Sequence, residues 1–378
     1  MLARSGQVPS IERNPHLQGL RCLHCQRQYP LQLVHSGCPA CEADGRHVSL
    51  QADYKAGAAG YKHLPYASGL SCGEGDTPLK NLPALATWAN VAHLHLKDES
   101  TNPTGSHKDR MSAVGVTQAL DFGAHTVVLA SSGNAAISAA WYARAAGLAC
   151  EVACYHGLAA AYAQQLDACS AKRFAFADNA GRWNFVKNRA ALPGYFALTN
   201  YHQPALGSAP LAIEGYKNIA YECHADGYLP EHIMVPTARG DLAWGVYAGY
   251  ADLLRAGLIA ALPKIWIVEP FARLSLVLAG QSLHGGYAGD TVQFSTAGAT
   301  VTYLQWQAAR RSAGGAVVVD DRAARMARDA LRLQGISAEL CAAAGLAAVQ
   351  VLRLQGDVAR QARVLVILTA NASKDPSH

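Results

Sequence analysis

Short apolar strands alternate with longer helical segments along much of this chain, and no other feature restricts its fold as strongly. In the first half, the expected strands are Thr126–Ala130, Ala149–Cys154 and Arg173–Phe176. Helices are expected after them, over residues 134–146, 159–169 and 180–191. Because strands that are joined by helical crossovers run in the same direction, this order predicts a parallel sheet with helices on both faces.

The same order returns in the second half of the chain, after a helical stretch expected over residues 213–224. The expected strands are His232–Pro236, Lys264–Val268 and Val364–Leu368, with a helix over 241–256. A length of 378 residues is sufficient for two domains. We therefore predict an α/β fold with two doubly wound lobes and mostly parallel sheets. Ligand sites in such folds lie at the carboxyl ends of the strands.

Charge and hydropathy exclude several classes of partner. The net charge of +5 is small for this length, so we expect no nucleic-acid binding. No apolar run approaches the ~20 residues that a membrane helix requires, and Met1–Gly6 lacks the apolar core of a secretory signal. These observations predict a cytoplasmic protein with no membrane partner, whose ten cysteines are mostly reduced.

Four of the cysteines form two pairs with the spacing of metal ligands. Cys22 and Cys25 make one Cys-x-x-Cys pair, and Cys38 and Cys41 make the other. Two such pairs place four thiolates around a tetrahedral ion, as in zinc ribbons, and Tyr29–Val34 between them fits a short hairpin. The alternative is a vestigial ribbon without metal. We expect a small N-terminal cysteine ribbon with a structural zinc ion, because no histidine or water position completes a catalytic geometry.

Lys108 is the principal candidate for a catalytic residue. It lies in the run Lys97–Arg110, between a strand expected at His93–Lys97 and a helix expected over 109–122. The amides at the start of a helix carry partial positive charge, which disfavours the ammonium form of a nearby lysine. A neutral amine can form a Schiff base with an aldehyde cofactor. A lysine at a helix start is most often a surface charge, but the preceding Asn102–Ser106 favours the catalytic interpretation.

A turn between a strand and a helix contains Ser131, Ser132, Gly133 and Asn134. Free amides at a helix N-terminus bind anions, and serine hydroxyls add further donors. These residues are therefore candidates for holding a substrate carboxylate. The alternative is ordinary capping of the helix by Ser132 or Asn134. Together with Lys108, the turn suggests pyridoxal phosphate (PLP) chemistry on a small amino acid.

A second strand-to-helix turn contains Thr237, Ala238, Arg239, Gly240 and Asp241. It is the natural position for a cofactor phosphate, because helix N-termini bind phosphate groups. Gly240 permits close approach of the backbone, and Arg239 can supply a positive charge. Taken alone, the composition of this turn is a weak signal.

Thr369 directly follows the last expected strand. A hydroxyl group at this position can hydrogen-bond a pyridine nitrogen without protonating it. Such a partner suits elimination and replacement chemistry better than transamination, which needs a protonated ring as a stronger electron sink. The alternative is an ordinary threonine at a strand end.

These motifs resemble those of threonine synthases and of the wider PLP fold type II group, which includes tryptophan synthase beta and the serine/threonine dehydratases. The resemblance covers nearly the whole chain. It rests on Leu20–Cys22 at the start of the ribbon, Cys72–Leu79 (similar to GEGxTPL), Asn102–Arg110 (similar to NPTGSFKDR), Ser131–Asn134 (SSGN), Glu214–Ala220 (similar to EGxKTIA) and Ile267–Pro270.

The resemblance implies a role for each matching residue. Lys108 would carry the Schiff base and act as general base or acid at Cα and Cβ. Asn134 would contact the phenolic oxygen of the cofactor, and Thr369 its pyridine nitrogen. His107, where the family usually has phenylalanine, would lie beside the ring.

Two groups of residues would bind anions by the same resemblance. The substrate carboxylate would be held by Ser131, Ser132, Gly133 and Asn134. The cofactor phosphate would be held by Thr237, Ala238, Arg239, Gly240 and Asp241. The resemblance also implies a ribbon-like segment over 1–50, a large PLP-binding lobe over 51–120 and 206–378, and a small mobile lobe over 121–205. A homodimer is common in the group.

The chain departs from the threonine synthase pattern at two places. The run before EGxK usually supplies an arginine for the phosphate of O-phosphohomoserine, and here that position is Ala212. Losing such a charge-assisted hydrogen bond costs about 1.5–3 kcal/mol. The phosphate loop, usually rich in glycine and asparagine, is here Ala238–Asp241.

We therefore expect a PLP-dependent, threonine-synthase-like lyase acting on a small β- or γ-substituted amino acid, such as O-phosphohomoserine. A dehydratase or ammonia-lyase acting on serine, threonine or a diamino acid is the alternative with the same cofactor. Release of phosphate, as against ammonia and a keto acid, distinguishes the two. A third interpretation, favoured by the altered phosphate loop, is a catalytically retired scaffold whose ribbon mediates protein contacts.

Overall fold

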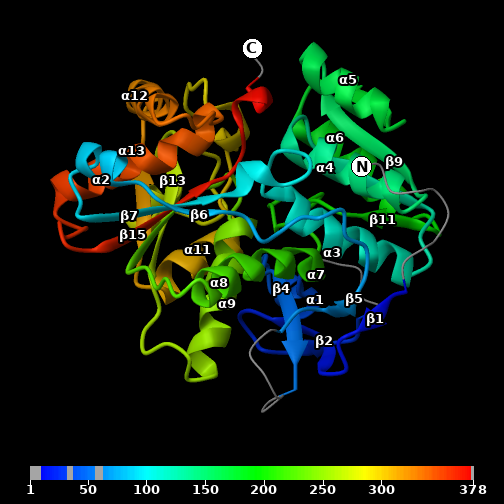
Figure 1. Cartoon of the computed structure of the whole chain (residues 1–378). Helices are drawn as coiled ribbons and strands as arrows, with labels where there is room; N and C mark the ends of the chain where they lie inside the picture. Colours follow the sequence, from blue (N-terminus) through cyan, green and yellow to red (C-terminus); the bar gives the residue numbers. More distant parts are fainter. Residues whose placement is uncertain (1–9, 32–36, 56–62, 376–378) are drawn as a thin grey trace. The chain divides into compact units, whose positions relative to one another are not determined.

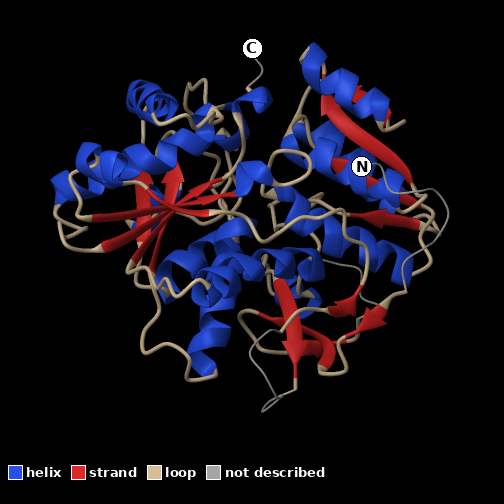
Figure 2. Cartoon of the chain, viewed as in Figure 1, coloured by secondary structure: helices blue, strands red, loops and turns tan. Residues whose placement is uncertain are grey.

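The computed structural model describes residues 10–31, 37–55 and 63–375, and the chain divides into two compact units. Unit 1 comprises Met1–Glu74 and Lys108–Gly215, and unit 2 comprises Gly75–His107 and Tyr216–His378. Each unit contains a sheet with helices packed against it, which confirms the predicted α/β fold class (Figure 2). The domain bounds expected from the sequence stay a prediction, because a division by contacts does not define independently folding domains.

Unit 1 contains a four-stranded parallel sheet in the order β10-β9-β8-β11. Its strands are β8 (Thr126–Ala130), β9 (Ala149–Tyr155), β10 (Lys172–Phe176) and β11 (Tyr195–Ala197). The accompanying helices are α3 (Lys108–Asp121), α4 (Asn134–Ala145), α5 (Ala160–Ala168), α6 (Asn179–Ala190) and α7 (Pro210–Ile213). Val128 and Ala130 pack with Trp183 of α6, and Leu129 on the opposite face is also fully buried. Both faces of β8 are therefore covered.

The N-terminal part of unit 1 is a small antiparallel sheet in the order β3-β2-β4. Its elements are β2 (Leu17–Cys22), β3 (Gln28–Tyr29), the short helix α1 (Pro39–Ala43) and β4 (Leu50–Tyr54). A separate pair is formed by β1 (Glu12–Arg13) and β5 (Tyr66–Ser68). A hairpin is expected over Tyr29–Val34. Tyr29 lies in β3, which pairs with β2, but residues 32–34 lie outside the described residues.

Unit 2 contains a six-stranded sheet in the order β14-β13-β12-β15-β7-β6, in which only the edge strand β6 is antiparallel to its neighbour. Its strands are β6 (Leu79–Asn81), β7 (His93–Asp98), β12 (His232–Pro236), β13 (Lys264–Glu269), β14 (Gly315–Val318) and β15 (Arg363–Leu368). The main helices are α2 (Pro83–Trp88), α8 (Lys217–Ala225), α9 (Asp241–Arg255), α10 (Leu274–Leu278), α11 (Tyr303–Arg311), α12 (Asp321–Leu333) and α13 (Leu340–Gln355).

Helices cover both faces of the unit 2 sheet. Figure 1 shows α2, α12 and α13 on one side and α8, α9 and α11 on the other. Met234, Val366 and Leu368 belong to the apolar core under α13, while their neighbours Ile233 and Ile367 are fully buried on the other face. This two-sided burial is the reason why the strands read as continuous apolar runs in the sequence.

Helix α13 approaches the sheet closely because small residues line its inner face. A Cβ atom on Gly345 would lie 3.0 Å from Cγ1 of Val366 and 3.2 Å from Cγ of Pro236. These neighbours belong to β15 and β12, whose carboxyl ends lead to Thr369 and Thr237. The packing of α13 therefore fixes the position of the strands that carry two predicted site residues.

The predicted strands are confirmed to within one residue at each end, and two other expectations are corrected. The helix expected over 213–224 is interrupted by a 3-10 turn at Glu214–Tyr216. The interruption occurs where the chain passes close to α3, since a Cβ on Gly215 would collide with the carbonyl oxygen of Arg110. The second expectation is that the residues from about 51 to 70, which are rich in glycine, alanine and tyrosine, form a connector after the ribbon, but they contain most of β4 and all of β5.

None of the helices among the described residues combines the length and the apolar character that crossing a bilayer requires.

Replacing Leu346 with alanine should destabilise the protein by about 2–5 kcal/mol, because this α13 side chain is fully buried in the core of unit 2. Leu354 lies in the same helix but is 88% exposed, so Leu354→Ala should change stability by less than about 0.5 kcal/mol. Urea denaturation of the two variants measures the difference, and equal losses would contradict this placement of the core.

Candidate active site

The residue before Lys108 is hydrogen-bonded to the residue that follows β15. The backbone N–H of His107 donates to the carbonyl oxygen of Thr369 at 2.9 Å, and its ring Nδ1 lies 3.0 Å from the same oxygen. Because a carbonyl oxygen accepts and never donates, Nδ1 must carry a proton in this contact. Lys108 follows His107 directly and is the first residue of α3, which begins one residue earlier than expected from the sequence.

Buried hydrogen bonds shape the loop that leads to His107. The Glu99 carboxylate is fully buried and accepts from Thr77 Oγ1 at 2.7 Å and from Asn102 Nδ2 at 2.9 Å. Gly105 has a φ of +82°, and a Cβ there would lie 2.6 Å from Nδ2 of Asn371. The motif residues of this loop therefore fix its backbone conformation. At Gly105 that conformation is accessible only to glycine.

The turn from Thr237 to Gly240 joins β12 to α9, a helix of 15 residues. Gly240 caps the helix with a φ of +88°, and its N–H donates to Thr237 Oγ1 at 3.2 Å. A Cβ on Gly240 would collide with the side chain of Gln305. The turn is thus a narrow cradle at a helix N-terminus, a position that favours phosphate groups.

Polar side chains that sequence reasoning missed are buried around this turn. Arg273 is fully buried, and its Nη1 donates to the carbonyl oxygen of Ala238 at 3.3 Å. Gln305 is also fully buried, and both polar atoms of its side-chain amide lack a hydrogen-bond partner within the described residues. Nη2 of Arg273 also lacks a hydrogen-bond partner within the described residues. Buried groups of this kind are costly unless they are paired. The two donors among them, Nε2 of Gln305 and Nη2 of Arg273, fit a bound anion such as a cofactor phosphate.

The electrostatics of the turn also favour an anion. Burial lowers the pKa of the Arg273 guanidinium, the Glu269 carboxylate opposes this effect, and the nearby charge of Arg239 adds to it. The Nε of Arg273 lies 3.5 Å from Oε2 of Glu269. Two positive charges close to one buried turn destabilise each other, and a phosphate between donors of this kind would relieve that repulsion.

In unit 1, the turn from Ser131 to Gly133 joins β8 to α4, which begins at Asn134. Gly133 N–H donates to Ser131 Oγ at 3.3 Å. Ser132 Oγ accepts from the backbone N–H of Tyr155 at 2.8 Å and from Nη1 of Arg182 at 3.2 Å. Arg182 was not anticipated from the sequence, because it lies 50 residues after Ser132 on a helix with no recognisable motif.

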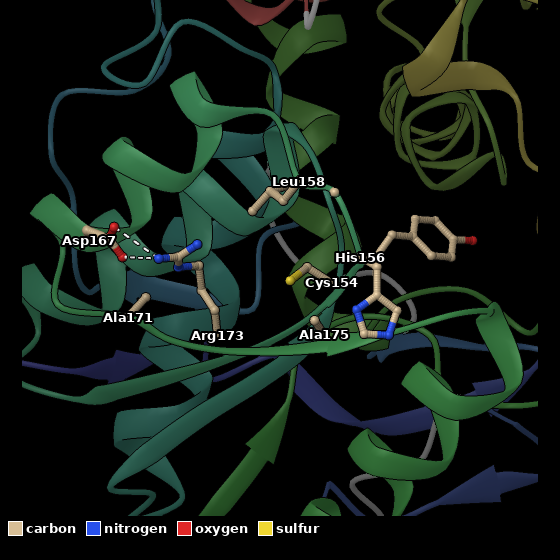
Figure 3. A pocket seen from close by; sticks show the side chains of 9 residues that line it. Cys154, His156, Leu158, Asp167, Ala171, Arg173 and Ala175 are labelled. Atoms are coloured by element: carbon tan, nitrogen blue, oxygen red, sulfur yellow. Dashed lines mark hydrogen bonds and ion pairs between the residues drawn. The ribbon is translucent and has the colours of Figure 1, made fainter.

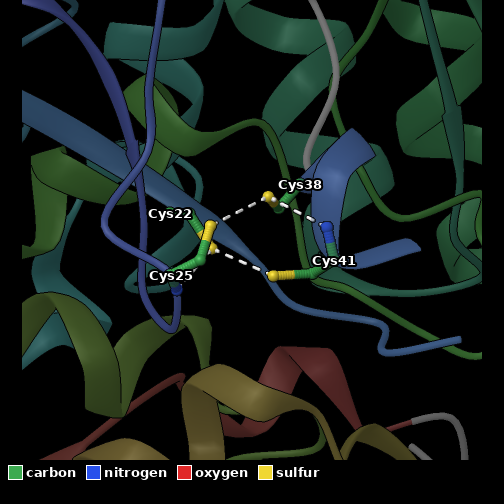
Figure 4. A group of neighbouring side chains, drawn as sticks. All are labelled: Cys22, Cys25, Cys38 and Cys41. Atoms are coloured by element: carbon green, nitrogen blue, oxygen red, sulfur yellow. Dashed lines mark hydrogen bonds between the residues drawn. The ribbon is translucent and has the colours of Figure 1, made fainter. Parts of the chain in front are cut away.

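The four cysteines of the ribbon form a cluster whose ligand atoms all lie within 4.8 Å of one another (Figure 4). The Sγ atoms of Cys22 and Cys41 are 3.7 Å apart, as are those of Cys25 and Cys38. A tetrahedral site with Zn–S bonds of about 2.3 Å has S–S edges of about 3.8 Å, so the cluster fits a zinc ion.

Backbone N–H groups support the cysteine cluster. The N–H groups of His24 and Cys25 point to Cys22 Sγ at 3.3 and 3.4 Å, and that of Cys41 points to Cys38 Sγ at 3.5 Å. Donors of this kind stabilise thiolate ligands. Four cysteines leave no open position on a tetrahedral ion, which indicates a structural rather than a catalytic site.

A pocket of about 520 Å³ opens in unit 1 (Figure 3). It is lined by Cys154–Leu158 after β9 and by residues from Asp167 to Ala175 around β10. Its wall carries an exposed ion pair, in which Arg173 Nη2 lies 2.9 Å from Asp167 Oδ1. None of the residues predicted for the active site lines this pocket, so it does not mark the predicted chemistry.

Comparisons with known proteins concern the family and the fold of the chain. A family model described as pyridoxal-phosphate dependent enzyme matches residues 70–370. The threonine synthase of Methanosarcina acetivorans is 29% identical over 319 residues, which cover 80% of this chain and 76% of that protein. The threonine synthase of Mycobacterium tuberculosis is 29% identical over 307 residues, covering 80% and 83%.

A solved structure of diaminopropionate ammonia lyase from Escherichia coli, in complex with D-serine, resembles the fold with a TM-score of 0.68. The two chains are 19% identical, and the match covers 80% of this chain and 86% of that one. A likeness at this identity concerns the fold, and it confirms the α/β architecture expected from the sequence.

Gly240→Ala should weaken the binding of PLP about tenfold or more, because alanine at this φ is strained by about 1–2 kcal/mol and its Cβ would also displace Gln305. Gly257, beyond the other end of α9, has a φ of +71° and open space around it. Gly257→Ala therefore carries the strain without the collision. Titration of both apoproteins with PLP, followed by absorbance, tests the difference, and equal affinities would contradict the cradle.

Proposed function

The chain belongs to the family of pyridoxal-phosphate dependent enzymes, and on this premise we propose that it is a threonine-synthase-like lyase. Its substrate is a small amino acid with a leaving group on the β or γ carbon, as in the conversion of O-phosphohomoserine to threonine and phosphate. The observation that carries the proposal is the group of buried donors around the turn from Thr237 to Gly240, since a cofactor phosphate accounts for Gln305 and Arg273.

The turn supplies the phosphate site of the cofactor. Thr237, Ala238, Arg239, Gly240 and Asp241 hold the phosphate through the first amides of α9 and through the charge of Arg239. Gln305 adds a side-chain amide from beneath Gly240. The carboxylate of Asp241, in the first turn of α9, compensates part of the positive charge at the helix N-terminus. The arginines must therefore balance the charge of the phosphate.

Lys108 would be the point of covalent attachment of the cofactor, and its amine would remove and return the proton at the substrate Cα. Bound PLP supplies an electron sink for the charge that develops there. Lys108 is the first residue of α3, where the positive end of the helix dipole disfavours a further positive charge. When PLP is bound, His107 would lie beside the cofactor ring, and the Thr369 hydroxyl would hydrogen-bond the pyridine nitrogen without protonating it.

The turn of unit 1 binds the substrate. Ser131, Ser132, Gly133 and Asn134 offer hydroxyl, backbone N–H and amide donors at the start of α4, which suit the carboxylate of an amino acid. Asn134 would also hydrogen-bond the phenolic oxygen of the cofactor. A carboxylate held in this way is oriented for proton removal from the adjacent Cα.

A second candidate reaction is elimination by a dehydratase or ammonia-lyase acting on serine, threonine or a diamino acid. Ala212 favours it, because this residue is fully buried in α7 and offers no charge for a substrate phosphate. The same residues of the chain serve both reactions up to the loss of the leaving group. The retired-scaffold interpretation is not proposed, since the family and the threonine synthase relatives support an enzyme.

We also propose that Cys22, Cys25, Cys38 and Cys41 hold a structural zinc ion. The cluster lies on a ribbon that is fastened to the rest of unit 1, where Ser49 Oγ donates to Leu206 O at 2.5 Å. Tyr54 OH donates to Glu214 Oε2 at 3.1 Å. The ion would therefore support the segments on both sides of α7. The cytoplasmic location and the homodimer stay predictions.

Borohydride treatment of the holoenzyme should leave a reduced PLP adduct on the peptide that contains Lys108, detectable by mass spectrometry. Lys108→Ala should lose this adduct and lower the rate with O-phosphohomoserine or L-threonine by about 10²–10⁴-fold or more, because the base is gone. Lys187→Ala, an exposed lysine on α6, serves as the control. A label on another lysine, or none, would falsify the assignment.

The purified protein should contain about one zinc ion per chain, measured by mass spectrometry of the metal. Cys38→Ser should remove the zinc and lower the melting temperature while the PLP content stays unchanged. Cys72→Ser, which changes a half-buried cysteine outside the cluster, should keep the zinc. Zinc-free wild-type protein with an unchanged melting temperature would rule out a structural ion.

A further inference from the structure

Ser132 Oγ already accepts two hydrogen bonds, so its hydroxyl can serve a further partner only as a donor. A serine hydroxyl has two acceptor positions and a single hydrogen. Both acceptor positions of Ser132 Oγ are used, one by the backbone N–H of Tyr155 at 2.8 Å and one by Arg182 Nη1 at 3.2 Å. The hydrogen of this hydroxyl is therefore directed away from both donors and toward an acceptor outside this pair of contacts.

Arg182 is a fixed cation at the same position. Its side chain is 5% exposed, and its guanidinium carbon lies 3.7 Å from the centroid of the Tyr155 ring. Its Nη2 also hydrogen-bonds Asn179 Oδ1, one helical turn earlier on α6. The flanking Trp183 is buried against the sheet, so the helix that carries Arg182 cannot easily shift. Such fixation reduces the entropy that the contact with Ser132 costs.

The charge of Arg182 also strengthens the hydrogen bond that the Ser132 hydroxyl can donate. A hydrogen bond from a guanidinium polarises the hydroxyl that accepts it and makes its own hydrogen a stronger donor. The effect is large in a buried site, where water screens little. An acceptor with a full negative charge gains most from both effects, whereas a neutral carbonyl oxygen gains only the hydrogen bond.

We propose that Arg182 is a positioning residue that makes Ser132 a donor and so selects substrates with a free carboxylate on the α-carbon. This inference rests on the proposed function, because it takes the turn from Ser131 to Asn134 as the carboxylate site. Arg182 acts through Ser132 and does not touch the reacting atoms. Its contribution is therefore to ground-state binding and orientation of the substrate.

L-Threonine and L-threoninamide are a matched pair of probes for this role, since they differ in the carboxylate alone. L-Threonine is the product of the threonine synthase reaction and one of the candidate substrates of the alternative elimination, so it is a suitable probe for both. Arg182→Gln should raise the dissociation constant of L-threonine about ten- to hundredfold, as judged by the shift of the cofactor absorbance band. The constant for L-threoninamide should change less than about threefold, and Arg182→Lys should restore part of the loss for L-threonine.

Two controls separate positioning from a loss of fold. Arg173→Gln removes an exposed arginine of unit 1 whose ion pair contributes little to stability, and it should leave the preference for L-threonine unchanged. In a double-mutant cycle with Ser132→Ala, Arg182→Gln should add little to the effect of Ser132→Ala, because both remove the same donor. Cofactor content and circular dichroism of each variant verify the holoenzyme.

The outcomes distinguish this inference from the function on which it rests. A wild-type protein that takes up PLP, with an Arg182→Gln variant that keeps the preference for L-threonine, overturns the positioning role alone. Equal losses for both probes, or additive effects in the cycle, overturn it as well, since a purely structural arginine behaves in that way. A wild-type protein that takes up no PLP overturns the proposed function, and the inference fails with it.

Discussion

One acceptor atom, the carbonyl oxygen of Thr369, ties together parts of the chain that are 262 residues apart. It receives the backbone N–H and the ring nitrogen of His107, so the loop before Lys108 ends at the carboxyl end of β15. The loop is fixed at its other end by the buried Glu99 carboxylate. Such fixation suits the role proposed for Lys108, because the amine of a catalytic lysine must stay within reach of one carbon atom through several proton transfers.

The strands and helices were predictable because they depend on local patterns. Thr126–Ala130 and His232–Pro236 are short apolar runs bounded by turns, and burial on both faces produces that pattern wherever the strand lies in the sheet. The interruption at Glu214–Tyr216 was not predictable, because it results from contact with the distant backbone of Arg110. Periodicity describes a segment and its burial, but not which backbone it passes.

The same distinction applies to the site. Lys108 and Ser131–Asn134 lie in turns whose composition is distinctive, so the sequence pointed to them. Arg182, Arg273 and Gln305 are single polar residues on or beside helices, where a solvated position is the ordinary expectation. Only their burial and their contacts with the turns distinguish them, and these properties exist after folding. The turn at Ala238–Gly240 shows the same point, since the buried polar groups next to it, Arg273 and Gln305, come from elsewhere in the chain.

Close packing of α13 against β12 and β15 has an effect on how this protein can evolve. Gly345 is not a predicted site residue, yet it packs against Val366, three residues before Thr369, and against Pro236, directly before Thr237. Larger side chains at Gly345 would push these strand ends apart while the fold survived. In a deep mutational scan selected for growth, this interior position would show the intolerance typical of a ligand contact, and a map of tolerated residues would place the boundary of the active centre too far into the core.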